Sequence, residues 1–322
     1  MGDTMKIEIR EFDKALSNEA VSLYKQAYLE EVYAMPFLPK DEQMMKIIDD
    51  SINELFEHGT GVMAFDEQKL IGYLAGWKVS QLFGPVKGIF SPMIGHTAKK
   101  EHRRAIYNKM LEHGMKQWVQ QGYLSFAVSL LAHDKGLIEE FFINGFGMRC
   151  IDAIRKSDRI QSSVKDVSVV KAELEYLKDI ASLHQNHHEY YKESPIFMPR
   201  EPEDALTDLN VWFSHQNHHL WIAKKEDKAI GYIRIQPEGE TIVSAHSQVM
   251  NVTGVYVKED VRALGVASLL LDEVQSWLIK QGYYLCGVDY ESINPAAYSF
   301  WNRYFTPYTF SVTRRIDERI AQ

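Results

Sequence analysis

The sequence predicts an α/β protein built from two tandem copies of one domain. The first observation is that landmarks of different kinds recur at a nearly constant spacing along the 322 residues. Gly72-Tyr73 recurs as Gly231-Tyr232 and Pro36 as Pro195, each 159 residues later, and Gln121-Gly122-Tyr123 recurs as Gln281-Gly282-Tyr283, 160 residues later. The second observation is that strand and helix patterns follow the same order in both halves. A period of this length indicates duplicated domains, because solenoid repeats are only about 20–50 residues long.

A polar stretch separates the two copies. Residues 158–165 contain Gln161-Ser162-Ser163 and show no apolar periodicity, which is typical of a linker. We therefore expect a first domain at residues 1–157, a linker at 158–165 and a second domain at 166–322.

The apolar pattern of the second half changes period in a definite order. Alternating and β-branched runs predict strands at 167–170, 220–224, 229–235, 249–257, 284–290 and 308–314. Patterns of helical period predict helices at 173–191, 203–216, 263–281 and 295–303. The first half repeats this order from Lys6 to Arg155.

Composition and charge narrow the function classes. The chain is 45% hydrophobic and 25% charged, which is typical of a folded globular protein. Its two cysteines, Cys150 and Cys286, are too few for a disulfide framework and suit a reducing cytoplasm. No apolar run approaches the ~20 residues that cross a bilayer, and residues 1–10 read as a first strand, not a signal peptide. The net charge of −8 argues against non-specific nucleic-acid binding.

The most informative motif lies between a strand and an apolar helix. The strand Val255-Tyr256-Val257 leads through a polar turn into Arg262-Ala263-Leu264-Gly265-Val266-Ala267-Ser268. The first N–H groups of a helix have no partner within it, and the helix dipole adds positive potential there. Gly265 allows the backbone to come close to an anion, and Arg262 supplies a cation.

This motif therefore predicts a phosphate or pyrophosphate site. No Lys-Ser/Thr pair follows the glycine, which excludes the magnesium-nucleotide loop. A helix start whose small residues only pack against a sheet would produce the same six residues, so the flanking sequence has to decide between the two.

Two segments together resemble the GNAT N-acetyltransferase superfamily. Arg262-x-x-Gly265-x-Ala267 is similar to its acetyl-CoA pyrophosphate loop. After the strand at 284–290, Asn294, Ala297, Phe300 and Phe305 stand at the positions of its Asn-x-x-Ala-aromatic run. The resemblance covers the second half and, through the repeat, implies two GNAT-type acyl-CoA acyltransferase domains. Each would be a mixed, mostly antiparallel sheet flanked by helices.

The resemblance also implies how acetyl-CoA is held. In that family the asparagine, here Asn294, binds the pantetheine arm, and Phe300 and Trp301 lie on the helix beside the thiol. A backbone N–H near Val255 or Tyr256 would polarise the thioester oxygen. Trp301 stands where many members carry a tyrosine acid, and an indole cannot fill that role.

The sequence offers alternatives for the acid and two carboxylates for the base. Tyr298 or Tyr304 is a substitute acid, or the thiol leaves as a thiolate without one. Asp289 stands where several GNAT enzymes place a glutamate base, and Glu291 faces the same side by strand alternation. Both carboxylates are equally compatible with a purely solvated strand end.

The first half departs from the motif at the same place. Aligned on Gly122-Tyr123, Ala105 replaces Gly265, and Tyr107 replaces Ala267 and would project into the pyrophosphate space. We expect that this copy has lost acetyl-CoA binding and shapes the acceptor pocket instead. Its basic residues (Lys99, Lys100, His102, Arg103 and Arg104) either form a solvated helix start or still hold a phosphate.

A histidine-rich pentapeptide occurs twice, at 184–188 and 215–219. Histidines four apart on a helix can chelate a metal, but no carboxylate or cysteine evidently completes a site. We expect surface histidines and no metal. The residues after the first copy, Glu189, Tyr190, Tyr191, Ile196, Phe197 and Met198, are candidates either for acceptor contact or for core packing.

The sequence thus predicts an acetyl-CoA-dependent N-acetyltransferase in the cytoplasm. Its second domain would transfer the acetyl group directly, without an acyl-enzyme, to a primary amine of a small molecule or peptide. No nucleic acid, membrane or metal is expected to take part. The alternative is a non-catalytic acyl-CoA-binding regulatory protein. Motifs encode neither the acceptor, which depends on loop shapes, nor the oligomeric state.

Overall fold

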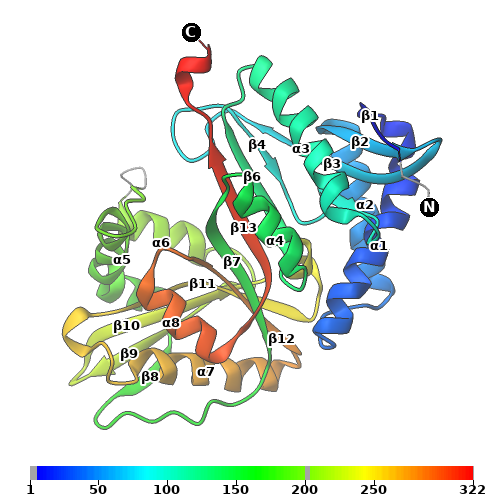
Figure 1. Cartoon of the computed structure of the whole chain (residues 1–322). Coiled ribbons are helices and arrows are strands. Elements are labelled where there is room, and N and C mark those ends of the chain that lie inside the picture. The colour runs from blue at the N-terminus through cyan, green and yellow to red at the C-terminus, as the bar shows by residue number, and fades with distance from the viewer. Residues whose placement is uncertain (1–5, 200–203, 322) are drawn as a thin grey trace. The chain divides into compact units, whose positions relative to one another are not determined.

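The structure is a computed structural model that describes residues 6–199 and 204–321 (Figure 1). Its helices are α1 (Ser17–Ala34), α2 (Glu42–His58), α3 (Arg103–Gln120), α4 (Lys135–Ile143), α5 (Leu177–Lys192), α6 (Ala205–Phe213), α7 (Val266–Gln281) and α8 (Pro295–Tyr304). Its strands are β1 (Ile7–Glu11), β2 (Thr60–Asp66), β3 (Lys69–Val79), β4 (Gly88–Ser91), β5 (His96–Ala98), β6 (Ser125–Leu131), β7 (Gly147–Lys156), β8 (Ser168–Lys171), β9 (His219–Lys225), β10 (Lys228–Gln236), β11 (Val249–Val257), β12 (Leu285–Glu291) and β13 (Thr306–Arg315).

The predicted element order of the second half is confirmed, and most bounds differ by one to three residues. The bounds of β11 are those predicted. The helix predicted from Ala263 begins instead at Val266, because Ala263 and Gly265 adopt positive φ angles of 62° and 91°. The helix predicted at 203–216 is α6, and Glu203 lies outside the described residues.

The chain divides into two compact units that exchange segments. Unit 1 contains residues 6–152, 241–246 and 307–321, and unit 2 contains the described residues of 153–240 together with 247–306. Within unit 1, His246 Nε2 lies 3.1 Å from the Asp41 carboxylate, and the Thr241 and Tyr308 hydroxyls are 2.6 Å apart. The repeat-based division at 158–165 therefore remains a prediction about the two copies, which these compact units do not follow.

Unit 1 is a mixed sheet in the order β1-β2-β3-β4-β6-β13, with β5 also paired to β3. Only β4 and β6 run parallel among these pairs. A buried cluster that includes Val62, Ala64, Ile106, Met110 and Trp118 packs α3 against the sheet. This is the mixed, mostly antiparallel architecture that was predicted.

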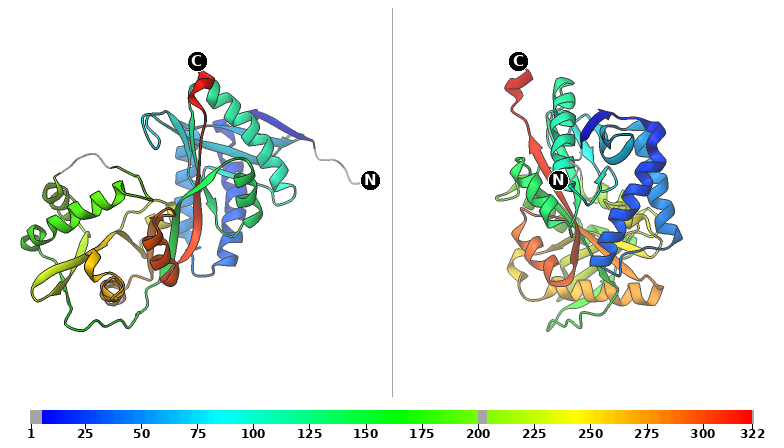
Figure 2. Two further views of the ribbon diagram at one scale, coloured as in Figure 1. Left: turned by 60° about the vertical axis from the view of Figure 1, so that its left-hand side comes forward. Right: turned by 45° about the vertical axis from the view of Figure 1, so that its right-hand side comes forward.

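Unit 2 has the strand order β12-β11-β10-β9-β8, in which only β11 and β12 run parallel. Alternate residues of β9 point to opposite faces. Leu220 and Ile222 join the buried cluster of α5 and α6, whereas the Trp221 ring lies 5.6 Å from the ring of Trp277 on α7. The sheet therefore lies between α5 with α6 on one face and α7 on the other, as the left view of Figure 2 shows.

The segment predicted as a linker is held against α7 within unit 2. Asp272 is 1% exposed and accepts hydrogen bonds from Arg159 Nε (2.8 Å) and Nη2 (2.7 Å). It also accepts from the backbone N–H groups of Ile160 (2.7 Å) and Gln161 (3.1 Å). The hydrogen bonds from Arg159 and the backbone outweigh the effect of burial and lower the pKa of Asp272 to about 2.

These contacts predict an acid-sensitive contribution to stability. The folded-state pKa lies below the unfolded value of 3.8, so the carboxylate stabilises the fold above pH 4. About 2 kcal/mol of the free energy of unfolding should be lost as the pH falls from 4 to 2. In Asp272→Asn that part of the urea-unfolding pH profile should flatten. A variant profile with the wild-type slope between pH 4 and 2 would remove Asp272 as its source.

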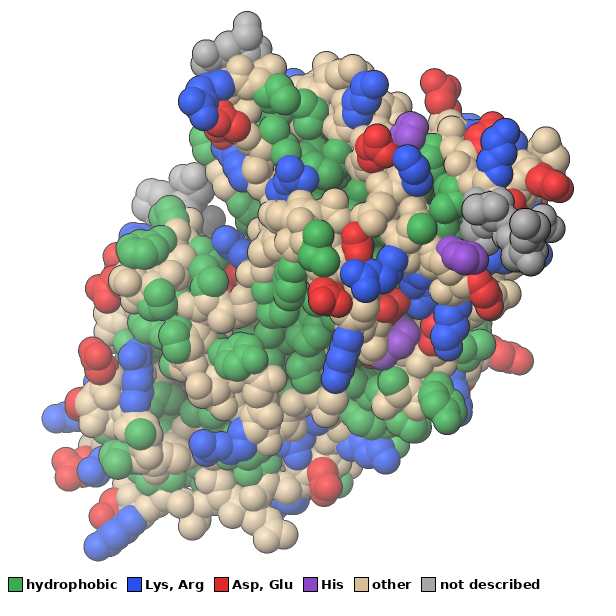
Figure 3. Space-filling view, viewed as in Figure 1, with side chains coloured by type: hydrophobic (Ala, Val, Ile, Leu, Met, Phe, Trp, Pro, Cys, Tyr) green, Lys and Arg blue, Asp and Glu red, His purple; other side chains and the backbone are tan. Residues whose placement is uncertain are grey.

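Among the residues that the structure describes, no helix has both the length and the hydropathy needed to cross a membrane. On the face shown in Figure 3, Lys and Arg side chains are interspersed with Asp and Glu. Charge of both signs is thus mixed on this face.

Candidate functional site

The two parallel strands of unit 2 pair over only part of their length. β11 and β12 are in register from Val249 with Leu285 to Val252 with Val288, and pairing stops there. Beyond this point a cavity of about 480 Å³ is lined by the second half of β11, the end of β12, α5, the start of α7 and most of α8. The opening between the strands therefore creates a site in the sheet itself.

A bulge in β11 marks the place where the strands part. β10 pairs Arg234 with Gly254 but Ile235 with Val252, which leaves Thr253 as an extra residue. Past the bulge, the Lys258 N–H donates to Ile230 O at 2.9 Å, so by alternation the Tyr256 N–H also faces β10. The Val255 N–H then faces the open side. Of the two predicted thioester donors, the geometry favours Val255.

The start of α7 presents backbone N–H groups to the same cavity. Gly265 precedes the helix at φ 91°, a left-handed conformation that side chains disfavour. The Leu269 N–H donates to Gly265 O at 3.0 Å, whereas the earlier N–H groups of the helix have no acceptor within the helix. Val266, Ala267 and Ser268 line the cavity, so this turn has the geometry of an anion cradle.

Arg262 is fixed beside this cradle by three contacts. Its Nε donates to Val257 O at 3.1 Å, and its guanidinium lies 4.9 Å from the Tyr190 ring and 5.6 Å from the Tyr256 ring. Tyr190 in turn donates to Asn294 Oδ1 at 3.0 Å. Asn294 is buried and also caps α8 by accepting the Ala297 N–H at 3.2 Å. The cradle arginine and the capping asparagine are therefore linked through one tyrosine.

Most of the residues predicted for the site lie together in this cavity. Those that line it are Val255, Tyr256, Val257, Arg262, Ala263, Gly265, Val266, Ala267, Ser268, Asp289, Asn294, Phe300 and Trp301. Leu264, Glu291 and Tyr298 do not. Leu264 is 60% exposed, and Tyr298 is 46% exposed with its ring against that of Tyr290. Glu291 is the last residue of β12 and is half-buried like Asp289, but it does not line the cavity.

The comparison with known families decides the identity of this part of the chain. Residues 182–305 match the sequence profile of the Acetyltransferase (GNAT) family. This segment is a GNAT domain. It contains every cavity-lining residue described above, from α5 to α8.

Solved structures extend the fold to the whole chain. The chain is similar to a GCN5-related N-acetyltransferase from Sphaerobacter thermophilus, with 12% identity, a TM-score of 0.60 and 97% of each chain covered. It is also similar to a tandem GNAT protein from the clavulanic acid biosynthesis pathway, with 11% identity, a TM-score of 0.52, and 96% of this chain and 98% of that one covered. A search of curated protein sequences finds no significant match. At these identities the likeness shows the fold, which is that of two tandem GNAT domains.

The GNAT cavity also contains residues that motif reading did not identify. His187, Arg234, Thr253 and Gly254 line it. A Cβ on Gly254 would lie 2.8 Å from Arg234 Nε, so the glycine makes room for that side chain. A glycine inside an otherwise β-branched strand is a signal for a bulge or a close approach, and it could have indicated this position. Tyr190 and Tyr191, which were candidates for acceptor contact, line the cavity as well.

The prediction of surface histidines is wrong for the first pentapeptide. His184 and His188 are 1% and 8% exposed, because the face of α5 that carries them packs on β10 and α6. Asp208 of α6 lies beside them. One ring nitrogen from each histidine and one carboxylate oxygen of Asp208 lie within 4.8 Å of one another. In the second pentapeptide His215 is exposed, as expected, whereas His218 and His219 are half-buried.

Unit 1 carries a modified version of the same arrangement. Arg103 Nε donates to Ala98 O, five residues earlier, at 3.1 Å, as Arg262 does to Val257 O. This equivalence places Ile106, not Ala105, at the position of Gly265. The helix α3 begins at Arg103 itself, so the turn that forms the cradle in the GNAT domain is helical here. The expectation that Tyr107 projects into the pyrophosphate space is wrong. Tyr107 is 2% exposed, and its hydroxyl lies 2.7 Å from His96 Nδ1.

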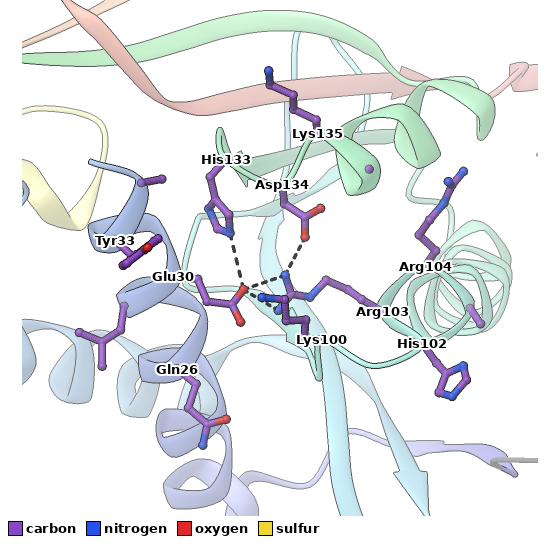
Figure 4. Close-up of a pocket in the computed structure, with 14 residues that line it drawn as sticks. Gln26, Glu30, Tyr33, Lys100, His102, Arg103, Arg104, His133, Asp134 and Lys135 are labelled. Atoms are coloured by element: carbon purple, nitrogen blue, oxygen red, sulfur yellow. Dashed lines mark hydrogen bonds and ion pairs between the residues drawn. The ribbon is translucent and has the colours of Figure 1, made fainter. Parts of the chain in front are cut away.

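Carboxylates surround the arginine of unit 1. Asp134 caps α4 as Asn294 caps α8, and it accepts from Arg103 Nη1 at 2.7 Å. Glu30 accepts from the same guanidinium at 3.2 Å and lies 3.6 Å from His133 Nε2 (Figure 4). These groups line an open hollow of about 1260 Å³. The charge of Arg103 is thus compensated by the carboxylates of Glu30 and Asp134, whereas Arg262 packs against two tyrosine rings.

Proposed function

We propose that the chain is an acetyl-CoA-dependent N-acetyltransferase whose active site is the cavity of unit 2. The observation that supports this most strongly is the coincidence of three features in one GNAT domain. The strands part at a bulge, the cradle turn lies at the start of α7, and the buried Asn294 caps the facing helix. A pyrophosphate and an extended thioester arm need an anion site and an opening for the arm in the same cavity.

The residues present fit acetyl-CoA along its length. The pyrophosphate would accept from the N–H groups at the start of α7, with Arg262 and Arg303, two of the three arginines that line the cavity, as its cations. The pantetheine arm would lie between β11 and β12, against Asn294 and the wall that Phe300 and Trp301 form. The Val255 N–H would stabilise the charge that develops on the thioester oxygen.

Direct attack by the amine is the chemistry that this site supports. The amine nitrogen bonds to the thioester carbon, the carbon–sulfur bond breaks, and the CoA thiolate leaves and takes a proton from solvent. Asp289 lines the cavity and would accept the proton that the nitrogen loses during attack. Cys286 is not a nucleophile for an acyl-enzyme, because complete burial raises the pKa of its thiol to about 12.

Unit 1 would bind no acyl-CoA in this account. Its cradle turn is helical, and the carboxylates of Glu30 and Asp134 compensate Arg103. A pyrophosphate there would have to displace two carboxylates from one guanidinium, and both carboxylates would repel it. The role that remains for this copy is structural.

One observation favours a second candidate function. Trp301 is 3% exposed and stands where many family members carry a tyrosine acid, which suits an acyl-CoA-binding regulator without turnover. The two functions separate in an assay of free CoA release from acetyl-CoA. The acceptor panel would contain lysine, spermidine, glucosamine and a peptide with a free N-terminus. Acetyl-CoA binding with release on at least one amine supports the enzyme. Tight binding without release on any acceptor class supports the regulator, and no binding contradicts both.

A further inference from the structure

A chain of hydrogen bonds connects a half-buried carboxylate to the wall of the unit 2 cavity. Asp208 Oδ2 lies 2.5 Å from His184 Nε2. The other ring nitrogen of His184, Nδ1, lies 2.8 Å from the Tyr232 hydroxyl. That hydroxyl is 2.9 Å from Nδ1 of His187, and His187 lines the cavity. Three secondary-structure elements, α6, α5 and β10, contribute to the chain.

The polarity of this chain follows from the chemistry of its ends. An ionised carboxylate only accepts, so Asp208 requires the proton of His184 on Nε2. His184 Nδ1 is then an acceptor, and Tyr232 donates its O–H to it. The Tyr232 oxygen accepts in turn from the N–H on Nδ1 of His187. His187 therefore carries its lone pair on Nε2, which is the nitrogen that can take up a proton.

Burial keeps the inner part of the chain in this state. Burial of His184 lowers its pKa to about 4, so the ring stays neutral at physiological pH. Burial acts to raise the pKa of Asp208, but the hydrogen bond from His184 and the nearby positive charge, including that of Arg234, together lower it. A proton that arrives at His187 is therefore held there and returns to solvent through the cavity.

The surroundings of His187 place it at the reacting end of the cavity. Its ring lies 5.6 Å from the ring of Tyr256, the neighbour of the Val255 donor, and 5.4 Å from that of Tyr191 on its own helix. On β10 the group that faces it is Tyr232. The charged residues of the cavity lining are Arg234, Arg262, Asp289 and Arg303.

We propose that His187 is a catalytic base that removes the first proton from the acceptor amine, and that Tyr232, His184 and Asp208 are positioning residues for it. This inference rests on the proposed function. A protonated amine gives up two protons in all. His187 Nε2 would take the first and so produce the neutral amine, which attacks the thioester carbon. Asp289 would accept the second as the amide forms.

The experiment measures kcat/KM for the best amine of the panel against pH, in the full chain and in His187→Gln and Tyr232→Phe. His187→Gln should lower kcat/KM about 10²-fold and remove the limb of the profile that rises with pH. Tyr232→Phe keeps the ring but removes the hydroxyl, so it should lower kcat/KM less and displace the same limb. The acetyl-CoA dissociation constant should not change in either variant.

A spectroscopic readout tests the deduced tautomer independently of turnover. In the 15N spectrum of histidine-labelled protein, His187 should show the Nδ1–H tautomer in the wild type and a mixture in Tyr232→Phe. A wild-type His187 with its proton on Nε2 would overturn the proposal even if the variants are inactive, and it does not depend on either variant folding normally.

A matched control comes from the second pentapeptide. His215, the first residue of that copy, is exposed, and His215→Gln should keep the wild-type rate and pH profile. His187→Gln with wild-type kcat/KM and an unchanged limb would contradict the role of His187 while leaving the acetyltransferase proposal intact. Failure of the wild type to bind acetyl-CoA would instead contradict the proposed function.

Discussion

Asp289→Asn is expected to lower turnover by one to four decades and to leave acetyl-CoA affinity nearly unchanged. Asparagine keeps the size and polarity of the side chain but cannot take up the proton that the amine nitrogen loses during attack. General-base catalysis contributes about 10²–10⁴-fold in typical enzymes, which sets the expected range. The measurement is kcat with the best amine of the panel, together with calorimetry for acetyl-CoA.

Glu291→Gln is the matched control for this substitution. Glu291 lies two residues further along the same strand, but it is not among the residues that line the cavity. Its variant should keep wild-type turnover within about twofold. Wild-type rates in Asp289→Asn would remove Asp289 from the mechanism, and a large loss in Glu291→Gln alone would transfer the role to that residue.

Gly265→Val is expected to weaken acetyl-CoA binding at least tenfold. Gly265 has a φ angle of 91°, and a side chain in the left-handed region costs roughly 1–2 kcal/mol, with β-branched residues the least tolerated. The turn either keeps its shape under strain or relaxes and turns its N–H groups away from the phosphate. Because each 1.4 kcal/mol corresponds to a tenfold change in affinity, relaxation alone accounts for about one decade.

The opposite end of the same helix provides the control. Gly282 ends α7 at a φ angle of 81° and lies outside the cavity lining. Gly282→Val should lower the melting temperature through comparable backbone strain without changing acetyl-CoA affinity. If both variants bind acetyl-CoA equally well, the turn at Gly265 is not the phosphate cradle.

The parts of the site that follow from local chemistry could be predicted from the sequence. Gly265, Arg262 and Asn294 lie where the motifs indicated, because a glycine at positive φ and a capping asparagine are requirements of the backbone itself. The bounds of β11 were predicted for a similar reason, since its β-branched run is continuous. Each of these features depends on neighbours within a few residues.

The parts that depend on tertiary packing could not be predicted in this way. His187 and Arg234 reach the cavity because α5 lies across β10, and neither residue belongs to a periodic pattern that marks a site. His184 and His188 were expected at the surface, although the helix face that carries them is buried against Asp208 and Tyr232. Polar residues on a buried face cannot be distinguished from exposed ones until their partners are known.

A one-residue difference in the spacing of the two copies changes which residue of the first copy is equivalent to the cradle glycine. Alignment on Gly122-Tyr123 gave an offset of 160 and placed Tyr107 at the cradle. The equivalent hydrogen bonds of Arg103 and Arg262 give 159 at this point, and Tyr107 turns into the core beside His96. The loss of the cradle stays a prediction, and its physical basis is now the helical turn and the carboxylates of Glu30 and Asp134.

The number and place of the acetyl-CoA sites test the central claim most directly. Calorimetric titration of the full chain with acetyl-CoA should give one site per chain. That site should be lost or strongly weakened in Gly265→Val. It should be retained in Lys100→Glu combined with Lys135→Glu, which reverses two exposed charges of the unit 1 hollow. Two sites per chain, or a single site that survives Gly265→Val and disappears with the two lysines, would contradict an active site in unit 2.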